Sequence, residues 1–145
     1  MSSDVFSFTF PQEVMPRELG LRVGEYVHSV GSLHIYDPDT ERVDAVLADP
    51  AGRAAPEWSF PSMPEGDNWP HIREVLRIEE ALRTGGHLGS TVDLPEYWAD
   101  VARLLELHRR VRANEVVDGD LLSSLPPLYR HLVTHWQPRV AAPTS

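Results

Sequence analysis

A stretch rich in proline, glycine and alanine occupies residues 50–68 of this 145-residue chain. Proline lacks a backbone donor and glycine is conformationally permissive, so such a stretch favours a loop over a helix or strand. We therefore expect three parts: an N-terminal segment over residues 1–49, a linker or loop over residues 50–68, and a C-terminal segment over residues 69–145.

The start of the N-terminal segment has a helical pattern that two prolines oppose. Apolar residues recur at helical spacing over residues 5–19, and Asp4 stands where an N-cap is expected. Pro11 and Pro16 lie inside this pattern, where each proline costs about 3 kcal/mol in a regular helix. The spacing predicts a helix, and the prolines conflict with it.

The rest of the N-terminal segment favours a strand followed by a helix. Residues 25–36, EYVHSVGSLHIY, alternate and are rich in β-branched and aromatic side chains. This pattern predicts a strand with a kink or bulge at Gly31. Residues 37–40, DPDT, are typical of a turn that caps a helix. We expect a short amphipathic helix after it.

The C-terminal segment has the caps and apolar stripes of successive helices. Asn68 caps the first helix, which is expected to end at Gly85–Gly86, and Asp93 caps the second. A third helical stretch, over residues 118–136, is broken at Pro126–Pro127. We expect this half of the chain to be mostly helical.

Composition narrows the chemistry. The chain has no cysteine and no lysine, and all 13 basic residues are arginine. Disulfides, thiolate metal sites and Schiff-base lysines are therefore excluded. The net charge of -9 argues against nucleic acid and anionic membrane surfaces as partners, because basic patches bind both. No apolar run is long enough to span a bilayer, and we expect a cytoplasmic protein.

Two candidate sites differ in strength. Residues 85–90, GGHLGS, follow a predicted helix and not a strand, so they favour a helix stop and loop over a phosphate-binding loop. His34 and Tyr36 lie two residues apart on the predicted strand, which places both side chains on one face. An imidazole and a phenol side by side can donate and accept hydrogen bonds, as a sugar hydroxyl requires.

Taken together, residues 3–43 resemble the thymidylate synthase family, over the segment from its uracil-reading asparagine to its His-x-Tyr strand. Asp4 takes the place of that asparagine, and the 30 residues from Asp4 to His34 match the spacing of the family without a gap. Gly24-Glu25-Tyr26-Val27 resembles the family's entry into the strand. The resemblance covers about the first third of the chain.

The resemblance implies a fold and an activity. The family methylates dUMP at C5 with 5,10-methylene-tetrahydrofolate, on a homodimer built over a large sheet. By resemblance, His34 and Tyr36 would hold the 3′-hydroxyl of a pyrimidine nucleotide, and Asp4 would face the base. We accordingly expect an α+β chain: a partial thymidylate synthase-like sheet and helix, followed by a mostly helical C-terminal half.

Asp4 favours cytosine over uracil. An ionised aspartate offers acceptors only, which suits the exocyclic amine of cytosine, and the related deoxycytidylate hydroxymethylases carry aspartate at this place. The ligand-free alternative is that Asp4 is only an N-cap.

The family's chemistry needs a cysteine thiolate, which adds at C6 of the base, and this chain has none. We therefore assign no catalytic or metal-ligating residue, and expect methylene-tetrahydrofolate not to bind this chain alone. Three interpretations stay open. The chain is the C-terminal portion of a C5 one-carbon transferase completed by another chain, a non-catalytic nucleotide-binding or protein-interaction module, or a truncated relic.

Overall fold

The structure is a computed structural model that describes residues 2–32, 34–48, 60–91, 93–134 and 139–140. It is mostly helical, with 61% of these residues in helices. The chain divides into two compact units, which we treat separately. Unit 1 comprises residues 1–24 and 60–145, and unit 2 comprises residues 25–59.

Unit 1 begins with α1 (Ser2–Leu19), which continues through both prolines. The predicted helix is therefore present despite Pro11 and Pro16. It ends at Gly20, whose φ of 65° is the left-handed conformation that glycine adopts after a helix. Asp4 is not the N-cap that the sequence predicted, because the helix already includes Ser2.

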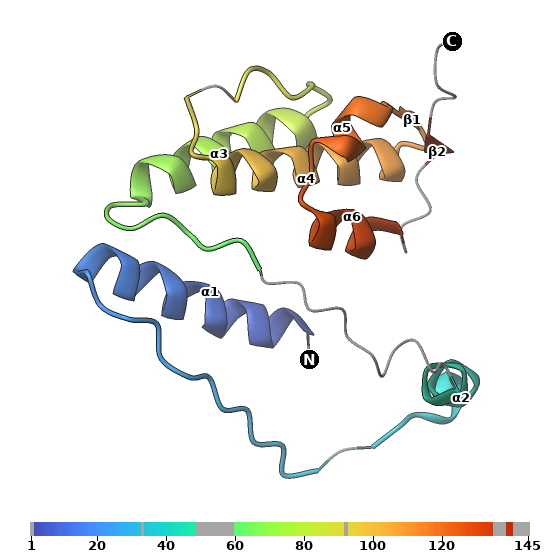
Figure 1. Cartoon of the computed structure of the whole chain (residues 1–145). Coiled ribbons are helices and arrows are strands. Elements are labelled where there is room, and N and C mark those ends of the chain that lie inside the picture. Colours follow the sequence, from blue (N-terminus) through green and yellow to red (C-terminus); the bar gives the residue numbers. More distant parts are fainter. Residues whose placement is uncertain (1, 33, 49–59, 92, 135–138, 141–145) are drawn as a thin grey trace. The chain divides into compact units, whose positions relative to one another are not determined.

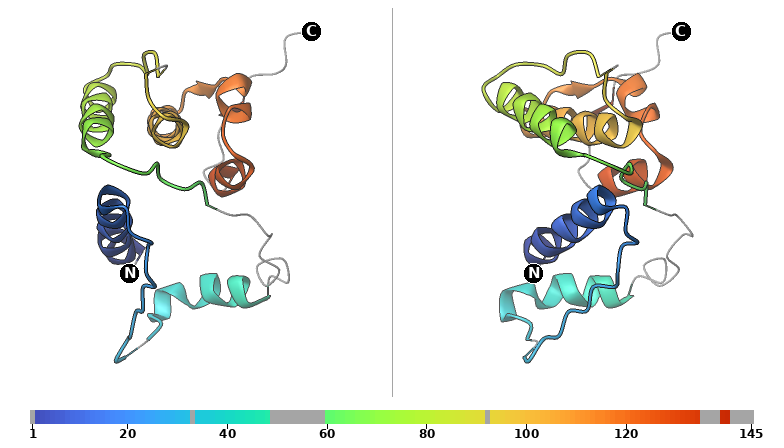
Figure 2. Two further views of the ribbon diagram at one scale, coloured as in Figure 1. Left: turned by 60° about the vertical axis from the view of Figure 1, so that its left-hand side comes forward. Right: turned by 90° about the vertical axis from the view of Figure 1, so that its left-hand side faces the viewer.

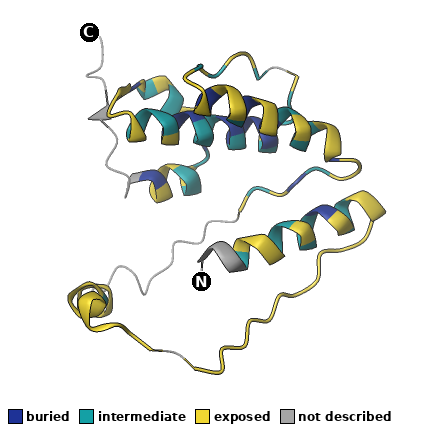
Figure 3. Ribbon diagram, turned by 180° about the vertical axis from the view of Figure 1, so that it is seen from behind, coloured by how far each residue is buried: buried dark blue, intermediate teal, exposed yellow. Residues whose placement is uncertain are grey.

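The centre of unit 1 is a pair of parallel helices, α3 (Trp69–Arg83) and α4 (Glu96–Arg112). They run side by side in the same direction, joined by a long crossover loop (Figures 1 and 2). Most of the buried residues in Figure 3 lie on these two helices. One core cluster joins α1, the 60–68 segment and both helices through four buried side chains: Val14, Met63, Val75 and Trp98.

The predicted boundaries of the C-terminal helices agree closely with the structure. Asn68 is the N-cap of α3, as predicted, and the helix stops just before Gly85–Gly86. The N-cap of α4 is Pro95, two residues after the predicted Asp93. The last predicted helix is broken by Pro126 into α5 (Gly119–Ser123) and α6 (Pro127–Thr134).

The only strands among the described residues are β1 (Val116–Val117) and β2 (Arg139–Val140). They pair in parallel over two residues each. Val117 is fully buried in a second core cluster, together with Leu107 of α4, Leu125 and Val133. This short pairing is not the partial sheet that the sequence predicted, and the α+β expectation is not confirmed.

Unit 2 contains a 3-10 turn, η1 (Asp37–Asp39), and the expected short helix α2 (Thr40–Ala48). The predicted strand before them is not formed: the described residues between Glu25 and Tyr36 belong to no strand. A strand requires a neighbour for its backbone groups. The described backbone of residues 25–35 has no backbone partner, and its side chains are exposed (Figure 3).

Within the part of the chain that the structure describes, we find no helix with the length and apolar character needed to cross a lipid bilayer.

Candidate functional site

The structure brings two of the three predicted site residues together. His34 and Tyr36 lie on the same side of the extended chain in unit 2, with His34 Nε2 3.2 Å from the Tyr36 hydroxyl. Their ring centroids are 5.1 Å apart and the rings are nearly perpendicular, at 87°. The alternation of an extended backbone accounts for this, because side chains two residues apart point to the same face.

This His34–Tyr36 pair is accessible to a ligand. Both residues are exposed, Tyr36 to 65% of its surface. A hydroxyl that donates to one partner still accepts from another, and an imidazole has a second ring nitrogen. The pair can therefore bind a hydroxyl group of a ligand while it keeps its own hydrogen bond.

A second pair with the same spacing lies upstream in the same segment. The Tyr26 hydroxyl is 3.0 Å from Nδ1 of His28, and their ring centroids are 6.1 Å apart. This Tyr26–His28 pair was not among the predicted site residues, although it has the same two-residue spacing. It provides a natural internal comparison for the His34–Tyr36 pair.

Asp4, the third predicted residue, lies near the start of α1 in unit 1. The other two residues belong to unit 2. The structure therefore bears on the His34–Tyr36 pair alone, and the position of Asp4 against a base stays a prediction.

A charged cluster near the end of α4 was not predicted from the sequence. The buried Glu106 accepts hydrogen bonds from Arg109 at 2.9 Å and from Arg110 at 2.7 Å. Arg109 also donates to Glu115 at 2.8 Å and lies 3.2 Å from His87 of the crossover loop. Burial alone would raise the pKa of Glu106, but the hydrogen bonds from the two arginines outweigh it and lower that pKa.

The spacing of Glu106 from Arg109 and Arg110 was the available sequence signal, because residues three and four apart are neighbours on a helix. These ion pairs have a structural role, because each charged group of the cluster is paired within unit 1. The groups are Glu106, Arg109, Arg110 and Glu115.

The remaining candidates do not form a reaction centre. Residues 85–90 form a loop between α3 and α4, as predicted, with no helix beginning directly after it. Among the described residues, no group of three or more His, Asp or Glu side chains is arranged to hold a metal ion.

Comparison with protein-family models and with curated proteins identifies no family for this chain. No protein-family model matches the chain. No curated protein matches it either.

Proposed function

We propose that this chain is the C-terminal portion of a thymidylate synthase-like pyrimidine-nucleotide C5 one-carbon transferase, and that it is inactive alone. The observation that supports the nucleotide role is the exposed, hydrogen-bonded His34–Tyr36 pair. It presents an imidazole and a phenol to one side of an extended backbone, the arrangement needed to hold a sugar hydroxyl.

In this proposal Asp4 selects the base. Its carboxylate accepts a hydrogen bond from the exocyclic amine of cytosine. The O4 of uracil is itself an acceptor and would form no hydrogen bond with the carboxylate. The transfer is then hydroxymethylation of a cytosine nucleotide in preference to methylation of dUMP.

In this proposal the missing chemistry comes from outside these 145 residues. C5 becomes nucleophilic only after a thiolate has added at C6, and no cysteine occurs in these residues. The His34–Tyr36 pair lies on exposed chain and offers no enclosed surface for a folate ring, so we assign no residue to methylene-tetrahydrofolate and derive no step through it.

The extended segment supports the need for a partner. Residues 25–36 have the composition of a strand, but the described backbone of residues 25–35 has no backbone hydrogen-bond partner among the described residues. An extended segment of this kind can add to the edge of a sheet in a partner, where main-chain hydrogen bonds give the affinity. Strand addition would also fix the His34–Tyr36 pair in one position.

Titration of the whole chain with dCMP, dUMP and a purine nucleotide, followed by backbone amide NMR, tests the nucleotide role. We expect weak binding, with a dissociation constant of about a millimolar, stronger for dCMP, and shifts centred on residues 34–36. Asp4→Asn should remove the preference for dCMP. Tyr36→Phe should weaken binding, because it deletes one of the hydroxyl's partners.

Tyr26→Phe is the matched control, since it deletes the equivalent hydroxyl from the Tyr26–His28 pair. It should leave nucleotide binding unchanged. Equal shifts with all three nucleotides, or equal effects of Tyr36→Phe and Tyr26→Phe, would show that the pair is an ordinary surface contact.

A second function, a protein-interaction module without catalytic role, is favoured by the unpaired extended segment alone. It predicts that a partner protein protects the amides of residues 25–36 from exchange while no nucleotide shifts residues 34–36. The two functions are thus distinguished by the nucleotide titration.

A further inference from the structure

A pocket of about 530 Å³ lies between the C-terminal halves of α3 and α4. This volume falls within the range of roughly 300–1,000 Å³ that small-molecule sites occupy. Because α3 and α4 run in parallel, both of their C-terminal ends contribute to it. The residues that line the pocket are Glu79, Leu82, Arg83, Leu105, His108, Arg109, Arg112 and Ala113.

The lining combines apolar and cationic groups. Leu82, which is 5% exposed, and the partly buried Leu105 provide apolar surface from the two helices. The lining also carries three arginines and a single glutamate. The chain as a whole has 22 acidic residues against 13 arginines, so the pocket reverses the charge balance of the protein.

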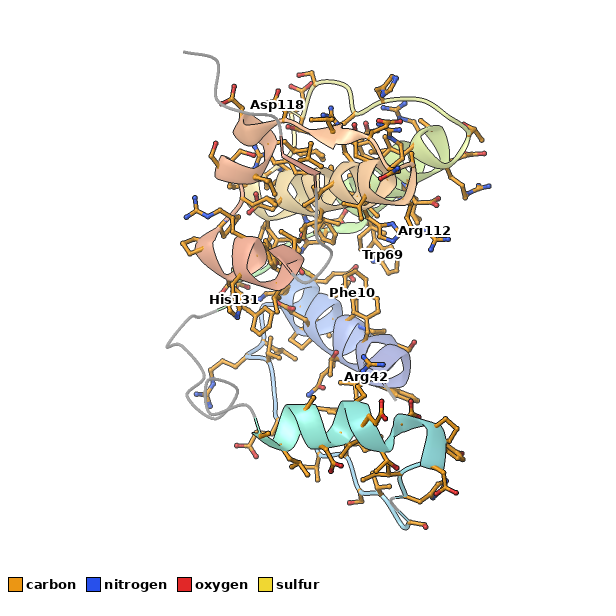
Figure 4. The ribbon with its side chains drawn as sticks, turned by 90° about the vertical axis from the view of Figure 1, so that its right-hand side faces the viewer. Phe10, Arg42, Trp69, Arg112, Asp118 and His131 are labelled. Atoms are coloured by element: carbon orange, nitrogen blue, oxygen red, sulfur yellow. The ribbon has the colours of Figure 1, made fainter. Side chains whose placement is uncertain are left out.

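The three arginines differ in how far they are available to a ligand. Arg109 is held by Glu106 and Glu115, so it forms part of the wall. Arg83 makes an exposed ion pair with Glu79 at 3.3 Å, and such pairs contribute little and exchange readily. The guanidinium group of Arg112 forms no hydrogen bond or ion pair with the described residues. It lies at the C-terminal end of α4 (Figure 4).

The helix ends alone do not account for this arrangement. Arginines in the last turn of a helix stabilise it by interacting with the helix dipole, which explains the presence of Arg83 and Arg112 without any ligand. The dipole effect does not explain an open pocket that two leucines line together with these cations. A concave site that combines apolar surface with charged groups able to fix a ligand's orientation is typical of ligand binding.

We propose that this pocket binds a small organic anion that carries an aromatic or other apolar group beside a carboxylate or phosphate. The apolar group packs on Leu82 and Leu105, and the anionic group accepts hydrogen bonds from Arg112 and from Arg83. Guanidinium groups bind both kinds of anion with two parallel hydrogen bonds. This site is independent of the His34–Tyr36 pair, which belongs to unit 2.

Backbone amide NMR of the whole chain tests the pocket with defined probes. Phenyl phosphate and benzoate are the two anionic probes, and their relative affinity distinguishes a phosphate from a carboxylate ligand. Inorganic phosphate and benzyl alcohol each supply half of the proposed chemistry. We expect the two complete probes to shift Leu82, Leu105 and Ala113, and the half-probes to bind at least about tenfold more weakly.

Two variants test the assigned contacts. Arg112→Ala should weaken binding by about tenfold or more, since one charge-assisted contact is lost. Ala113→Glu should do the same by placing a carboxylate at the pocket. The matched control is Arg73→Ala, another exposed arginine, on α3 outside the pocket lining.

The proposal is wrong if neither complete probe shifts the pocket residues, if benzyl alcohol binds as well as benzoate, or if Arg112→Ala and Arg73→Ala have the same effect. Nucleotide shifts at residues 34–36 do not affect this result, so the pocket and the proposed function can fail separately.

Discussion

Asn68 shows how one residue can have the predicted position and a different role. It is the N-cap of α3, but its side chain caps nothing. Instead its amide group donates to the carbonyls of Pro64 and Gly66, at 2.8 and 3.0 Å, and its Oδ1 accepts from Trp98 Nε1 at 2.8 Å. Asn68 is 1% exposed and therefore connects the 60–68 segment to α4 inside the core.

Asn68→Asp tests the amide hydrogen bonds, because aspartate is accepted at an N-cap position as readily as asparagine. A carboxylate cannot donate, and it would face two carbonyl oxygens in a buried site. We expect a loss of about 2–4 kcal/mol in the free energy of unfolding, measured by chemical denaturation. The control is Asp118→Asn at the N-cap of α5, where Asp118 does accept from the Asp120 amide. An equally small effect of both variants would mean that the amide hydrogen bonds of Asn68 contribute little to stability.

Glu106 makes the stability of unit 1 depend on pH. Its pKa is lowered in the folded chain, so its contribution to stability is present above its ordinary pKa of 4.5 and is lost as the pH falls through the lower folded pKa. Asp100 works in the opposite direction, because burial raises its pKa. The difference in unfolding free energy between the wild-type chain and a Glu106 variant isolates the contribution of Glu106 from that of the other titrating groups.

Glu106→Gln should cost about 2 kcal/mol at neutral pH, since hydrogen bonds to charged groups contribute roughly 1.5–3 kcal/mol. The cost should shrink as the pH falls below 4.5, as measured by urea unfolding over a pH series. Glu80→Gln, at an exposed position on α3, should show no such trend. A pH-independent cost for Glu106→Gln would show that packing, and not charge, is lost.

At the scale of the element, α1 is a helix that contains two residues unfavourable to helix formation. Pro11 and Pro16 cannot donate to the preceding turn, yet α1 runs from Ser2 to Leu19. Packing offsets the cost: Val14 is buried against the central helices, and Phe10 meets Trp98 edge-on at 6.3 Å. Figure 4 labels Phe10 on this helix.

Replacing both prolines by alanine should therefore stabilise the chain. The gain in unfolding free energy could reach about 3 kcal/mol per site, because each substitution restores a donor and removes a steric clash. Thermal denaturation followed by circular dichroism measures it. Pro70→Ala is the control, since a proline in the first turn of α3 replaces a donor that has no helical partner there. Equal midpoints for all variants would mean that α1 is not a continuous helix in solution.

The helices could be predicted from the sequence because their signals are local. Caps, first-turn prolines and terminal glycines set the ends of α3, α5 and α6 within a few residues. The strand predicted over residues 25–36 was wrong, because strand formation depends on a pairing partner that composition does not reveal. The same alternation correctly places His34 and Tyr36 on one face, since this needs only an extended backbone.

Hydrogen exchange of the isolated chain tests this account of residues 25–36. Their described backbone amides have no backbone acceptors, so we expect exchange close to that of an unfolded chain, while α4, which contributes Trp98, Ala102 and Leu107 to the core, stays protected. Protection of residues 25–36 in the chain alone would contradict the structure and point to a strand already paired, as in a dimer of this chain.

At the scale of the whole molecule, the same difference between local and long-range contacts decides which sites could be predicted from the sequence. The His34–Tyr36 pair could be predicted because its members are two residues apart. The pocket could not, because it depends on α3 and α4 lying parallel across a crossover loop. The contact between Arg109 and His87 has the same origin, since 22 residues separate them in sequence.

The chemistry of the whole molecule gives the last prediction. The purified chain should release no tritium from C5-labelled dCMP or dUMP in the presence of methylene-tetrahydrofolate. Release requires covalent addition at C6 to activate C5, and these residues contain neither a cysteine nor a lysine. The positive control is an intact thymidylate synthase under the same conditions, which should release tritium from labelled dUMP.

Two outcomes separate the interpretations of this chain. If tritium is released only when a cysteine-bearing chain is added, and Tyr36→Phe reduces that release while Tyr26→Phe does not, the transferase interpretation is supported and the His34–Tyr36 pair acts in it. Release by the chain alone would contradict the requirement for a thiolate and would demand another nucleophile. The remaining candidate nucleophiles are serine, threonine, histidine, tyrosine and the carboxylates, and replacement of His34 and then His28 by alanine would be the first step in finding it.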